Sequence, residues 1–264
     1  MERLLTYQTL IALLEGGVLT VTLNRPDSLN AINERMAAEL NDAAAFAERE
    51  AEVRCVVLTG EGKGFCSGQD LRDRAGTIGI SYGELLRARL NPIVLSLRAL
   101  EKPVIAAVNG VAAGAGCSLA LAADLRIASD RASFALSFSR IGLIPDGGAT
   151  FLLPRLVGMA RSLEMAFSGE AVEAAEALRL GLVNRVVPHD DLPASASQLA
   201  RRLAAGPTRA FGLAKRAVNA GLCGSLEAAL ENEARLQEIA GKTRDHNEGL
   251  AAFLEKREPR FEGR

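Results

Sequence analysis

Two glycine-rich junctions could hold a developing negative charge. They span residues 60–68 and 109–116, each follows an apolar run (53–59 and 104–108), and the second opens a helical pattern. Backbone N–H groups at such junctions can converge on an anion, aided by the helix dipole. Neither junction matches the P-loop or the G-x-G-x-x-G pattern of nucleotide sites. They therefore indicate either ordinary strand-to-helix turns or an oxyanion site, where each donor contributes about 2.7–4 kcal/mol.

Asp146 is the candidate acid or base. It lies in GLIPDGGAT, among apolar residues and glycines, and the next basic residue along the chain is Arg155. A carboxyl group in such surroundings tends to have a raised pKa, which suits general acid–base catalysis. The other interpretation is an aspartate that caps a helix over 149–157. The sequence alone leaves both interpretations open.

A third pattern, GCSLA at 116–120, approaches the G-x-S-x-G turn of serine hydrolases. Ser118 would then need a histidine, and the chain has two, His189 and His246. Because the segment around His246 is polar and reads as a solvated helix, a small serine packed between helices is favoured. Neither histidine has a second ligand at metal-binding spacing. The four cysteines form no C-x-x-C pair, which predicts buried free thiols in a reducing cytoplasm and no metal site.

Composition excludes several classes of protein. The chain has 264 residues, enough for one large or two small domains, and 31 basic against 32 acidic residues. This balance argues against a nucleic-acid partner, and a hydrophobic content of 48% excludes disorder. Residues 103–123 carry no charge and are long enough to span a membrane, but the Asn109-Gly110 turn signal predicts a buried strand, a turn and a buried helix. We expect a cytoplasmic protein that contacts no membrane.

Strands alternate with helices in the first part of the chain. Hydrophobic periodicity predicts strands over 18–23, 53–59, 104–108, 125–129 and 181–187, an amphipathic helix through Ile32, Met36, Leu40 and Ala44 that opens after Ser28 or Asn30, and a helix over 82–99. From about residue 150 the pattern is mostly helical, with helices bracketed by Pro207 and Gly221 and by Ser225 and Gly241. These patterns predict an α/β core followed by a helical C-terminal region.

Five motifs in order resemble the crotonase (enoyl-CoA hydratase/isomerase) superfamily: RP with LNA in 25–31, GEGKGFCSGQDL, AAVNGVAAGAGCSLALAAD, IGLIPDGGAT and EGLAAFLEKREPRF. The resemblance implies an α/β spiral of ββα units over 1–200 and a helical region over 201–264 that builds trimers, often paired into hexamers. Within the superfamily, AVNGVAAGAG and FSRIGLIPDGGATFLLPRLVG are most similar to the epoxyphenylacetyl-CoA isomerases of phenylacetate degradation.

The resemblance also assigns site residues. The backbone N–H groups of Gln69 and Ala115 would bind the oxygen of an acyl-CoA thioester, with alanine at the second position where the family usually has glycine. The residues placed along the coenzyme A and substrate path are Arg25, Ala31, Ser67, Gly68, Asp70, Leu71, Phe138, Phe253 and Lys256, of which the last two would reach the adenine end from a neighbouring subunit. The pocket walls would come from 72–92 and 134–140. No separate cofactor is implied, because coenzyme A is part of the substrate.

Departures from the family pattern predict the reaction. A typical hydratase of this superfamily carries two glutamates, and the matching positions here are Ser118 and Phe138. Neither can act unaided as a general base, whereas Asp146 matches the acid/base position of the isomerases. We therefore expect an acyl-CoA isomerase that moves a double bond from the β,γ to the α,β position, or rearranges the ring epoxide of phenylacetyl-CoA.

Three alternatives to an isomerase remain. The first is a hydratase that uses Asp146 or another carboxylate to activate water. The second is an aroyl-CoA dehalogenase, which is disfavoured because no histidine precedes His189. The third is a protein without catalysis, either an acyl-CoA binder or a superfamily member that binds RNA, and the absence of a basic stripe argues against RNA.

Overall fold

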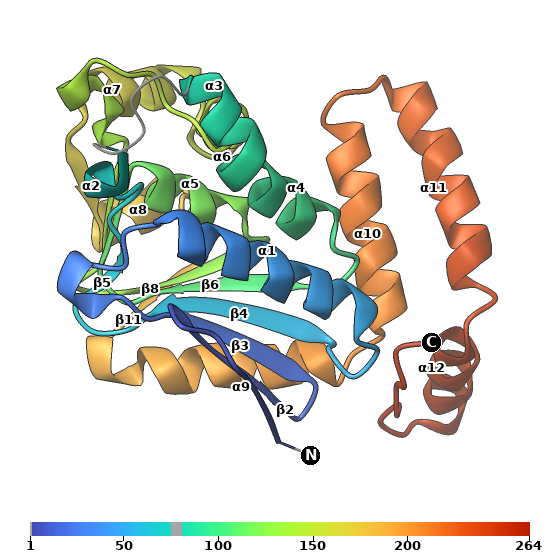
Figure 1. Ribbon diagram of the computed structural model, residues 1–264. Coiled ribbons are helices and arrows are strands. Elements are labelled where there is room, and N and C mark those ends of the chain that lie inside the picture. Colours follow the sequence, from blue (N-terminus) through green and yellow to red (C-terminus); the bar gives the residue numbers. More distant parts are fainter. Residues whose placement is uncertain (1, 75–80) are drawn as a thin grey trace.

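Two β-sheets and their covering helices form the molecule in the computed structural model, which describes residues 2–74 and 81–264 (Figure 1). The larger sheet has the strand order β1-β2-β3-β4-β6-β8-β11, and the smaller one has the order β10-β9-β7-β5. The smaller sheet contains no strand longer than three residues in the described part of the chain.

The elements have the following bounds. The strands are β1 (Arg3–Leu5), β2 (Leu10–Glu15), β3 (Val18–Leu23), β4 (Cys55–Gly60), β5 (Gly64–Cys66), β6 (Val104–Val108), β7 (Val111–Ala113), β8 (Leu125–Ser129), β9 (Ser133–Ala135), β10 (Ala171–Glu173) and β11 (Arg185–Val187). The helices are α1 (Glu34–Arg49), α2 (Leu71–Arg74), α3 (Tyr82–Leu85), α4 (Asn91–Ala99), α5 (Ala115–Ala122), α6 (Ala149–Val157), α7 (Met159–Ser168), α8 (Ala174–Arg179), α9 (Leu192–Ala204), α10 (Thr208–Gly221), α11 (Leu226–Ala240) and α12 (Arg244–Glu255). Four short helical turns complete the list: η1 (Pro26–Ser28), η2 (Leu86–Leu90), η3 (Ser137–Ile141) and η4 (His189–Asp191).

The same two-strand unit recurs along the chain. Strands β4, β6 and β8 lie side by side and parallel in the large sheet, and each is followed by a short strand, β5, β7 or β9, of the small sheet. The short strands are also parallel neighbours. Helices follow each pair: α2 to α4 after β5, α5 after β7, and α6 and α7 after β9. This repetition confirms the predicted spiral of ββα units.

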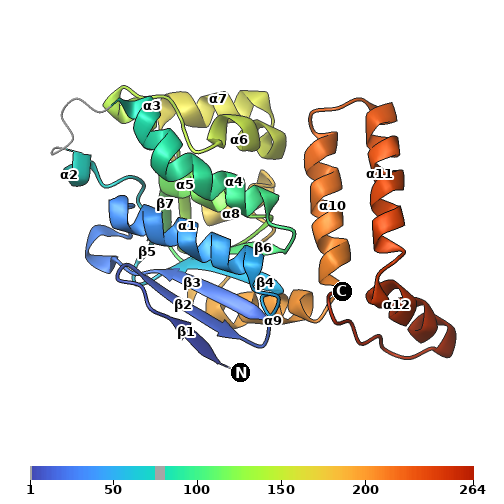
Figure 2. The same cartoon turned by 45° about the vertical axis from the view of Figure 1, so that its right-hand side comes forward.

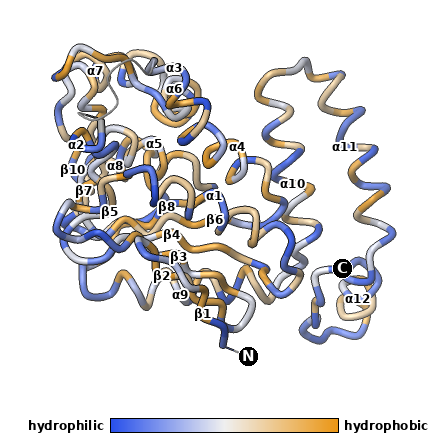
Figure 3. Tube along the Cα trace, viewed as in Figure 1, coloured by the Kyte–Doolittle hydropathy of each residue, from blue (hydrophilic) through white to orange (hydrophobic). Residues whose placement is uncertain are grey.

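Helices cover both faces of the large sheet, and the strands between them are apolar (Figures 1 and 3). On one face α1 and α4 contribute Met36, Leu40, Ile93 and Leu97 to a core shared with Val21 and Leu58. On the other face α9 contributes Leu192, Ala196 and Ala200, which pack on Val57, Ile105 and Ile127. Burying each large aliphatic side chain of this kind stabilises the fold by about 1.5–3 kcal/mol.

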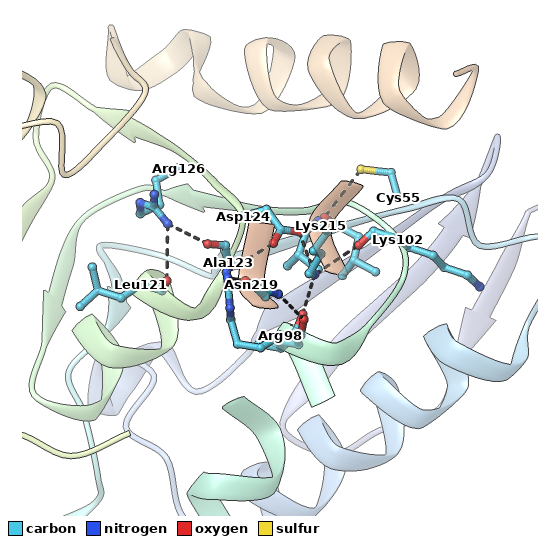
Figure 4. A network of polar contacts seen from close by, with 12 residues as sticks. Cys55, Arg98, Lys102, Leu121, Ala123, Asp124, Arg126, Lys215 and Asn219 are labelled. Atoms are coloured by element: carbon cyan, nitrogen blue, oxygen red, sulfur yellow. Dashed lines mark hydrogen bonds and ion pairs between the residues drawn. The ribbon is translucent and has the colours of Figure 1, made fainter. Parts of the chain in front are cut away.

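The C-terminal helices extend from the core as a hairpin of α10 and α11, followed by α12 (Figures 1 and 2). A buried lysine on α10 forms hydrogen bonds and an ion pair with the core. Lys215 Nζ donates to the Leu97 carbonyl at 2.7 Å and to Asp124 Oδ2 at 2.9 Å, and Asn219, one turn further on, hydrogen bonds to Arg98 (Figure 4). The division into 1–200 and 201–264 stays a prediction, and its boundary lies within α9.

The predicted start of the first helix is wrong. Helix α1 begins at Glu34, where Asn33 accepts a hydrogen bond from the Met36 N–H at 2.8 Å, and not after Ser28 or Asn30. Leu29 and Asn30 have φ values of 49° and 58°, in the left-handed region, which a right-handed helix does not accommodate. The sequence before α1 is a turn that returns the chain toward the second sheet.

Other boundaries also differ from the prediction. The segment 181–187 is a strand only over β11, and both glycine-rich junctions contain a short strand, β5 or β7, that the sequence did not reveal. The helix predicted over 82–99 consists of α3, η2 and α4 in succession.

The uncharged segment 103–123 contains the predicted buried strand, β6, and the predicted buried helix, α5, but the short strand β7 lies between them where a turn alone was predicted. Across the described residues, every helix is too short or too polar to cross a membrane.

Candidate active site

Parallel pairing of β5 and β7 places the two glycine-rich junctions side by side. Two glycines permit this close approach. A methyl group on Gly110 would collide with the Lys63 carbonyl oxygen, and one on Gly116 would collide with the carbonyl of Cys66. Because any side chain at these positions would force the junctions apart, glycine is required at both.

The N–H groups of Gln69 and Ala115 are both unpaired in the described part of the chain. Ile32 donates to the Gly68 carbonyl at 2.7 Å and accepts from Asp70 at 2.9 Å, so the Gln69 N–H points away from this bridge. Ala115 opens α5, and the N–H groups of a first helical turn have no partner within the helix. A methyl group on Gly68 would lie 3.3 Å from the Ala115 nitrogen. The structure therefore brings the two predicted donor segments into contact.

Asp146 lies between η3 and α6, with one carboxyl oxygen buried. That oxygen, Oδ1, has no hydrogen-bond partner among the described residues. Burial raises the pKa of Asp146 to about 6. The predicted alternative, that Asp146 caps the following helix, is wrong, because the N-cap of α6 is Gly148 and no side chain caps it. What remains is a desolvated carboxyl group without a structural partner.

Ser118 links Asp146 to the first turn of α5. Its hydroxyl donates to the Asp146 carbonyl at 2.8 Å and approaches the Gly114 carbonyl at 3.4 Å. Gly147 has φ +58°, and a methyl group there would lie 2.8 Å from the Ser118 Cβ, so glycine permits this approach too. The interpretation of Ser118 as a hydrolase nucleophile is wrong, because its hydroxyl is fully buried in these contacts and His246 lies on the exposed surface of α12. The packed-serine interpretation is confirmed.

Phe138 and Ser137 form a wall beside the donor segments. A methyl group on Gly114 would lie 3.9 Å from the Phe138 Cζ and 3.7 Å from the Ser137 Oγ. Sequence reasoning missed Ser137; the one signal was its place within 134–140, a segment expected to line the pocket. The backbone explains its position, because the Gly114 N–H donates to the Ala135 carbonyl at 2.9 Å. Of the other expected wall, 72–92, residues 75–80 lie outside the described residues.

Several residues assigned to the coenzyme A path gather beside these donors. Arg25 makes an ion pair with Asp70 at 2.9 Å and donates to the Ala31 carbonyl at 2.5 Å, and the Ser67 hydroxyl donates to the Ser28 carbonyl at 3.0 Å. Burial by itself would raise the pKa of Asp70, but the Arg25 hydrogen bond and nearby positive charges lower it below its ordinary value. Arg25 therefore shares its charge with Asp70 and fixes the turn that precedes α1.

Leu71 opens α2 next to this cluster and is largely exposed. Phe253 and Lys256, by contrast, lie on and just after α12, at the opposite end of the molecule from α2 and α5 in both views (Figures 1 and 2). The Phe253 side chain is 80% exposed. Within one chain the structure does not bring these two residues to the donors.

A buried arginine holds the far end of α5, which sequence reasoning did not single out. Arg126 donates to the Ala123 carbonyl at 2.7 Å and approaches the Leu121 carbonyl at 3.5 Å, at the C-terminal end of the helix (Figure 4). It also donates to the Leu182 carbonyl at 2.7 Å. A positive charge there satisfies the last carbonyls and complements the helix dipole. Both ends of α5 are thus fixed, with the free N–H of Ala115 at the other end.

Comparisons with known proteins agree with this architecture. Residues 14–264 match the family model described as enoyl-CoA hydratase/isomerase. The chain is 46% identical over 257 residues to the 1,2-epoxyphenylacetyl-CoA isomerase of Escherichia coli, covering 95% of this chain and 97% of that protein. It is 39% identical over 247 residues to the short-chain-enoyl-CoA hydratase of Clostridium acetobutylicum, covering 92% and 93%.

Among solved structures, an enoyl-CoA hydratase of Mycobacterium smegmatis superposes with a TM-score of 0.91 at 35% identity, covering 96% of this chain and 99% of that one. Similar proteins thus include both an isomerase and hydratases, so similarity alone does not select the reaction. The motifs, the two-strand repeat and these matches together establish that the chain belongs to the enoyl-CoA hydratase/isomerase, or crotonase, family.

Proposed function

We propose that this enzyme is an acyl-CoA isomerase with a single carboxyl group as its acid and base. The observation that carries the proposal is Asp146, whose buried Oδ1 has no partner within the described chain and whose pKa is raised to about 6. A carboxyl group with a pKa near 6 can both accept and return a proton at neutral pH. The Ser118 hydrogen bond supports its placement beside the first turn of α5.

For a substrate with a β,γ double bond, the proposed reaction needs two stages. The thioester oxygen accepts hydrogen bonds from the Gln69 and Ala115 N–H groups. The Asp146 carboxylate removes a proton from the carbon next to the thioester carbonyl, and the electron pair moves onto the oxygen, where the two donors stabilise the enolate. The protonated Asp146 then returns that proton to the carbon two positions further along. The electrons flow back and leave the double bond conjugated with the carbonyl.

Hydration is the second candidate, supported by the hydratase relatives. The residues at the two positions where the family's hydratases usually have glutamates, Ser118 and Phe138, argue against hydration. Ser118 donates its hydroxyl proton to a backbone carbonyl, and Phe138 offers only an apolar ring, 7% exposed. Moving one proton within a bound substrate requires one carboxyl group, whereas the family's hydratases use two. The apolar ring would also exclude water from the reacting carbons.

The acyl group that we propose is either a straight chain with a β,γ double bond or ring-epoxidised phenylacetyl-CoA. Similarity to the isomerase of E. coli supports the second. We propose no cofactor beyond the coenzyme A that the substrate itself carries. Cys55, Cys66 and Cys117 are free and buried as predicted, whereas Cys223 is exposed, contrary to the prediction. Free thiols suit a reducing compartment such as the cytoplasm.

We also propose that the enzyme assembles as a homotrimer or a pair of trimers. The C-terminal helices support this, because they expose large apolar side chains that a monomer would leave in water: Val218, Leu226, Leu230, Leu250, Phe253 and Leu254. Light scattering with size-exclusion chromatography measures the mass directly, and a monomer at micromolar concentration would contradict this part of the proposal.

A substrate panel tests the reaction. Straight-chain β,γ-enoyl-CoAs and ring-epoxidised phenylacetyl-CoA are incubated with the wild-type enzyme and with Asp146→Asn. The products are separated from the substrate by liquid chromatography and identified by mass spectrometry. We expect a product of unchanged mass and a loss of at least about a hundredfold in kcat for the variant, because asparagine cannot accept the proton. Products that gain one water would favour hydration, and turnover by Asp146→Asn within tenfold of wild type would exclude Asp146 as the acid/base.

A further inference from the structure

Ser137 lies at the start of η3, beside the N-terminus of α5. Gly114 precedes the candidate donor Ala115 and has φ +51°. A methyl group placed on Gly114 would lie 3.7 Å from the Ser137 Oγ, 3.9 Å from the Phe138 Cζ and 4.0 Å from the Gly68 Cα. The serine hydroxyl therefore borders the same space as both donor segments.

The Ser137 hydroxyl is uncommitted, unlike other serines of this region. Ser118 donates to the Asp146 carbonyl and Ser67 to the Ser28 carbonyl. The Ser137 hydroxyl has no hydrogen-bond partner among the residues that the structure describes. Ser139 is also unpaired, but its hydroxyl lies against Gly169, at 2.9 Å from a methyl group placed there, and not against Gly114. Of these four serines, Ser137 alone combines a free hydroxyl with a place beside Gly114.

The position of Ser137 is fixed by backbone contacts on both sides. Two residues before it, the Ala135 carbonyl accepts from the Gly114 N–H at 2.9 Å. One residue after it, the Phe138 carbonyl accepts from the Leu143 N–H at 3.0 Å. Because the backbone is held on both sides, a ligand need order only the rotation of the Ser137 side chain and its hydroxyl on binding.

We propose that Ser137 determines substrate specificity by donating a hydrogen bond to an oxygen atom on the acyl group. The inference rests on the proposed acyl-CoA site and narrows its substrate class to thioesters whose acyl group bears a hydroxyl, ether or epoxide oxygen close to the reacting carbons. A hydrocarbon chain gives the hydroxyl no partner once water is displaced, which disfavours such ligands. Phe138 supplies the apolar contact for the rest of the group.

Binding of stable, unreactive ligands tests this inference separately from turnover. Calorimetry compares ortho-hydroxyphenylacetyl-CoA with phenylacetyl-CoA, and β-hydroxybutanoyl-CoA with butanoyl-CoA. We expect the wild type to bind the oxygen-bearing member of at least one pair about five- to tenfold more tightly, in line with one net hydrogen bond. Ser137→Ala should remove that preference, and Ser137→Thr, which keeps the hydroxyl, should retain most of it.

Ser139→Ala is the matched control, because it deletes a neighbouring hydroxyl that faces Gly169, and it should leave both affinities within twofold. An unchanged preference in Ser137→Ala, or the absence of a preference in the wild type, overturns the inference. Loss of the preference in Ser137→Ala together with no isomerase turnover would support the role of Ser137 while rejecting the proposed reaction. No binding of any thioester would reject both.

Discussion

The fully buried hydroxyl of Ser118 donates a hydrogen bond to the backbone carbonyl of Asp146, with an Oγ to O distance of 2.8 Å. The motif resemblance implies that typical hydratases of the family carry a glutamate at the position of Ser118. Here the same position of α5 anchors the segment that carries the candidate acid. Ser118 therefore supplies no carboxyl group to the site and instead supports the backbone of the residue that does.

Replacing Ser118 by alanine should loosen that support. We expect a loss of about 1 kcal/mol in the free energy of unfolding, typical of one hydrogen bond, and a fall in kcat larger than the change in KM, because Asp146 would be less well placed. Denaturant unfolding and steady-state kinetics measure the two effects. Ser139→Ala removes a buried hydroxyl that has no partner in the described structure, and it should be neutral or slightly stabilising. Equal effects of the two variants would contradict the assignment.

The raised pKa of Asp146 predicts how stability depends on pH. Burial raises its pKa from 3.8 to about 6, so the native state favours the protonated form, and this contribution is complete below pH 3.8 and is lost as pH rises through 6. Asp146→Asn cannot ionise. We therefore expect this variant to be more stable than wild type by on the order of 1–2 kcal/mol at pH 8, after allowing for partial exposure, with the difference vanishing near pH 4.

Urea unfolding of both proteins across this pH range gives the measurement. Asp27→Asn is a control, because Asp27 is exposed and lies in η1, away from Asp146. As a surface substitution away from the site, Asp27→Asn should change the free energy of unfolding by less than about 0.5 kcal/mol. If the difference in free energy of unfolding between Asp146→Asn and wild type did not change with pH, the Asp146 carboxyl group would be well solvated in the native state.

Local patterns in the sequence predicted the long elements well. Alternation in 18–23 and the apolar run 104–108 became β3 and β6, and Ser225 caps α11 by accepting from the Ala228 N–H as expected. The start of α1 was misplaced because Leu29 and Asn30 have positive φ. Leucine gives no signal of this conformation, and asparagine, although enriched in it, is equally common at the start of a helix.

Contacts between distant segments were not predictable in the same way. The three-residue strands β5 and β7 are too short to show periodicity, and their pairing alone places Gly68 beside Ala115. The sequence indicated an apolar setting for Asp146, which explains its raised pKa. It could not reveal that Ser118 reaches the Asp146 carbonyl, because that contact joins residues 28 positions apart.

The buried Lys215 should be essential for the attachment of α10. Its side chain is 10% exposed, and its ammonium group donates to Asp124 and to the Leu97 carbonyl. Removing one partner of such a pair leaves the other poorly compensated, although Asp124 keeps the Val104 N–H and a longer contact with Arg98. We expect Lys215→Met to lower the free energy of unfolding by about 2–3 kcal/mol. It should also speed amide hydrogen exchange in α10, which mass spectrometry measures.

Lys242→Met is the matched control for that substitution. Lys242 pairs with Glu238 on the surface of α11, and both side chains are more than three-quarters exposed. An exposed ion pair contributes little to stability, so we expect Lys242→Met to change the free energy of unfolding by less than about 0.5 kcal/mol. If both lysine variants lost the same stability, burial of Lys215 would not explain its effect.

Phe253 should contribute to coenzyme A binding only in the assembled enzyme. Its ring is exposed on α12, far from the donor segments of its own chain, so any contact with the adenine end must come from another subunit. Phe253→Ala should weaken binding of an acyl-CoA by about three- to tenfold, as expected for loss of one aromatic contact, and leave binding of the matching acyl-pantetheine, which lacks the adenosine part, unchanged. Phe167→Ala, on α7 and 75% exposed, should change neither affinity. Calorimetry compares the affinities of variants whose oligomeric mass has been verified. If Phe253→Ala weakened binding of the acyl-CoA and of the acyl-pantetheine equally, Phe253 would act through subunit assembly and not by contacting the adenine.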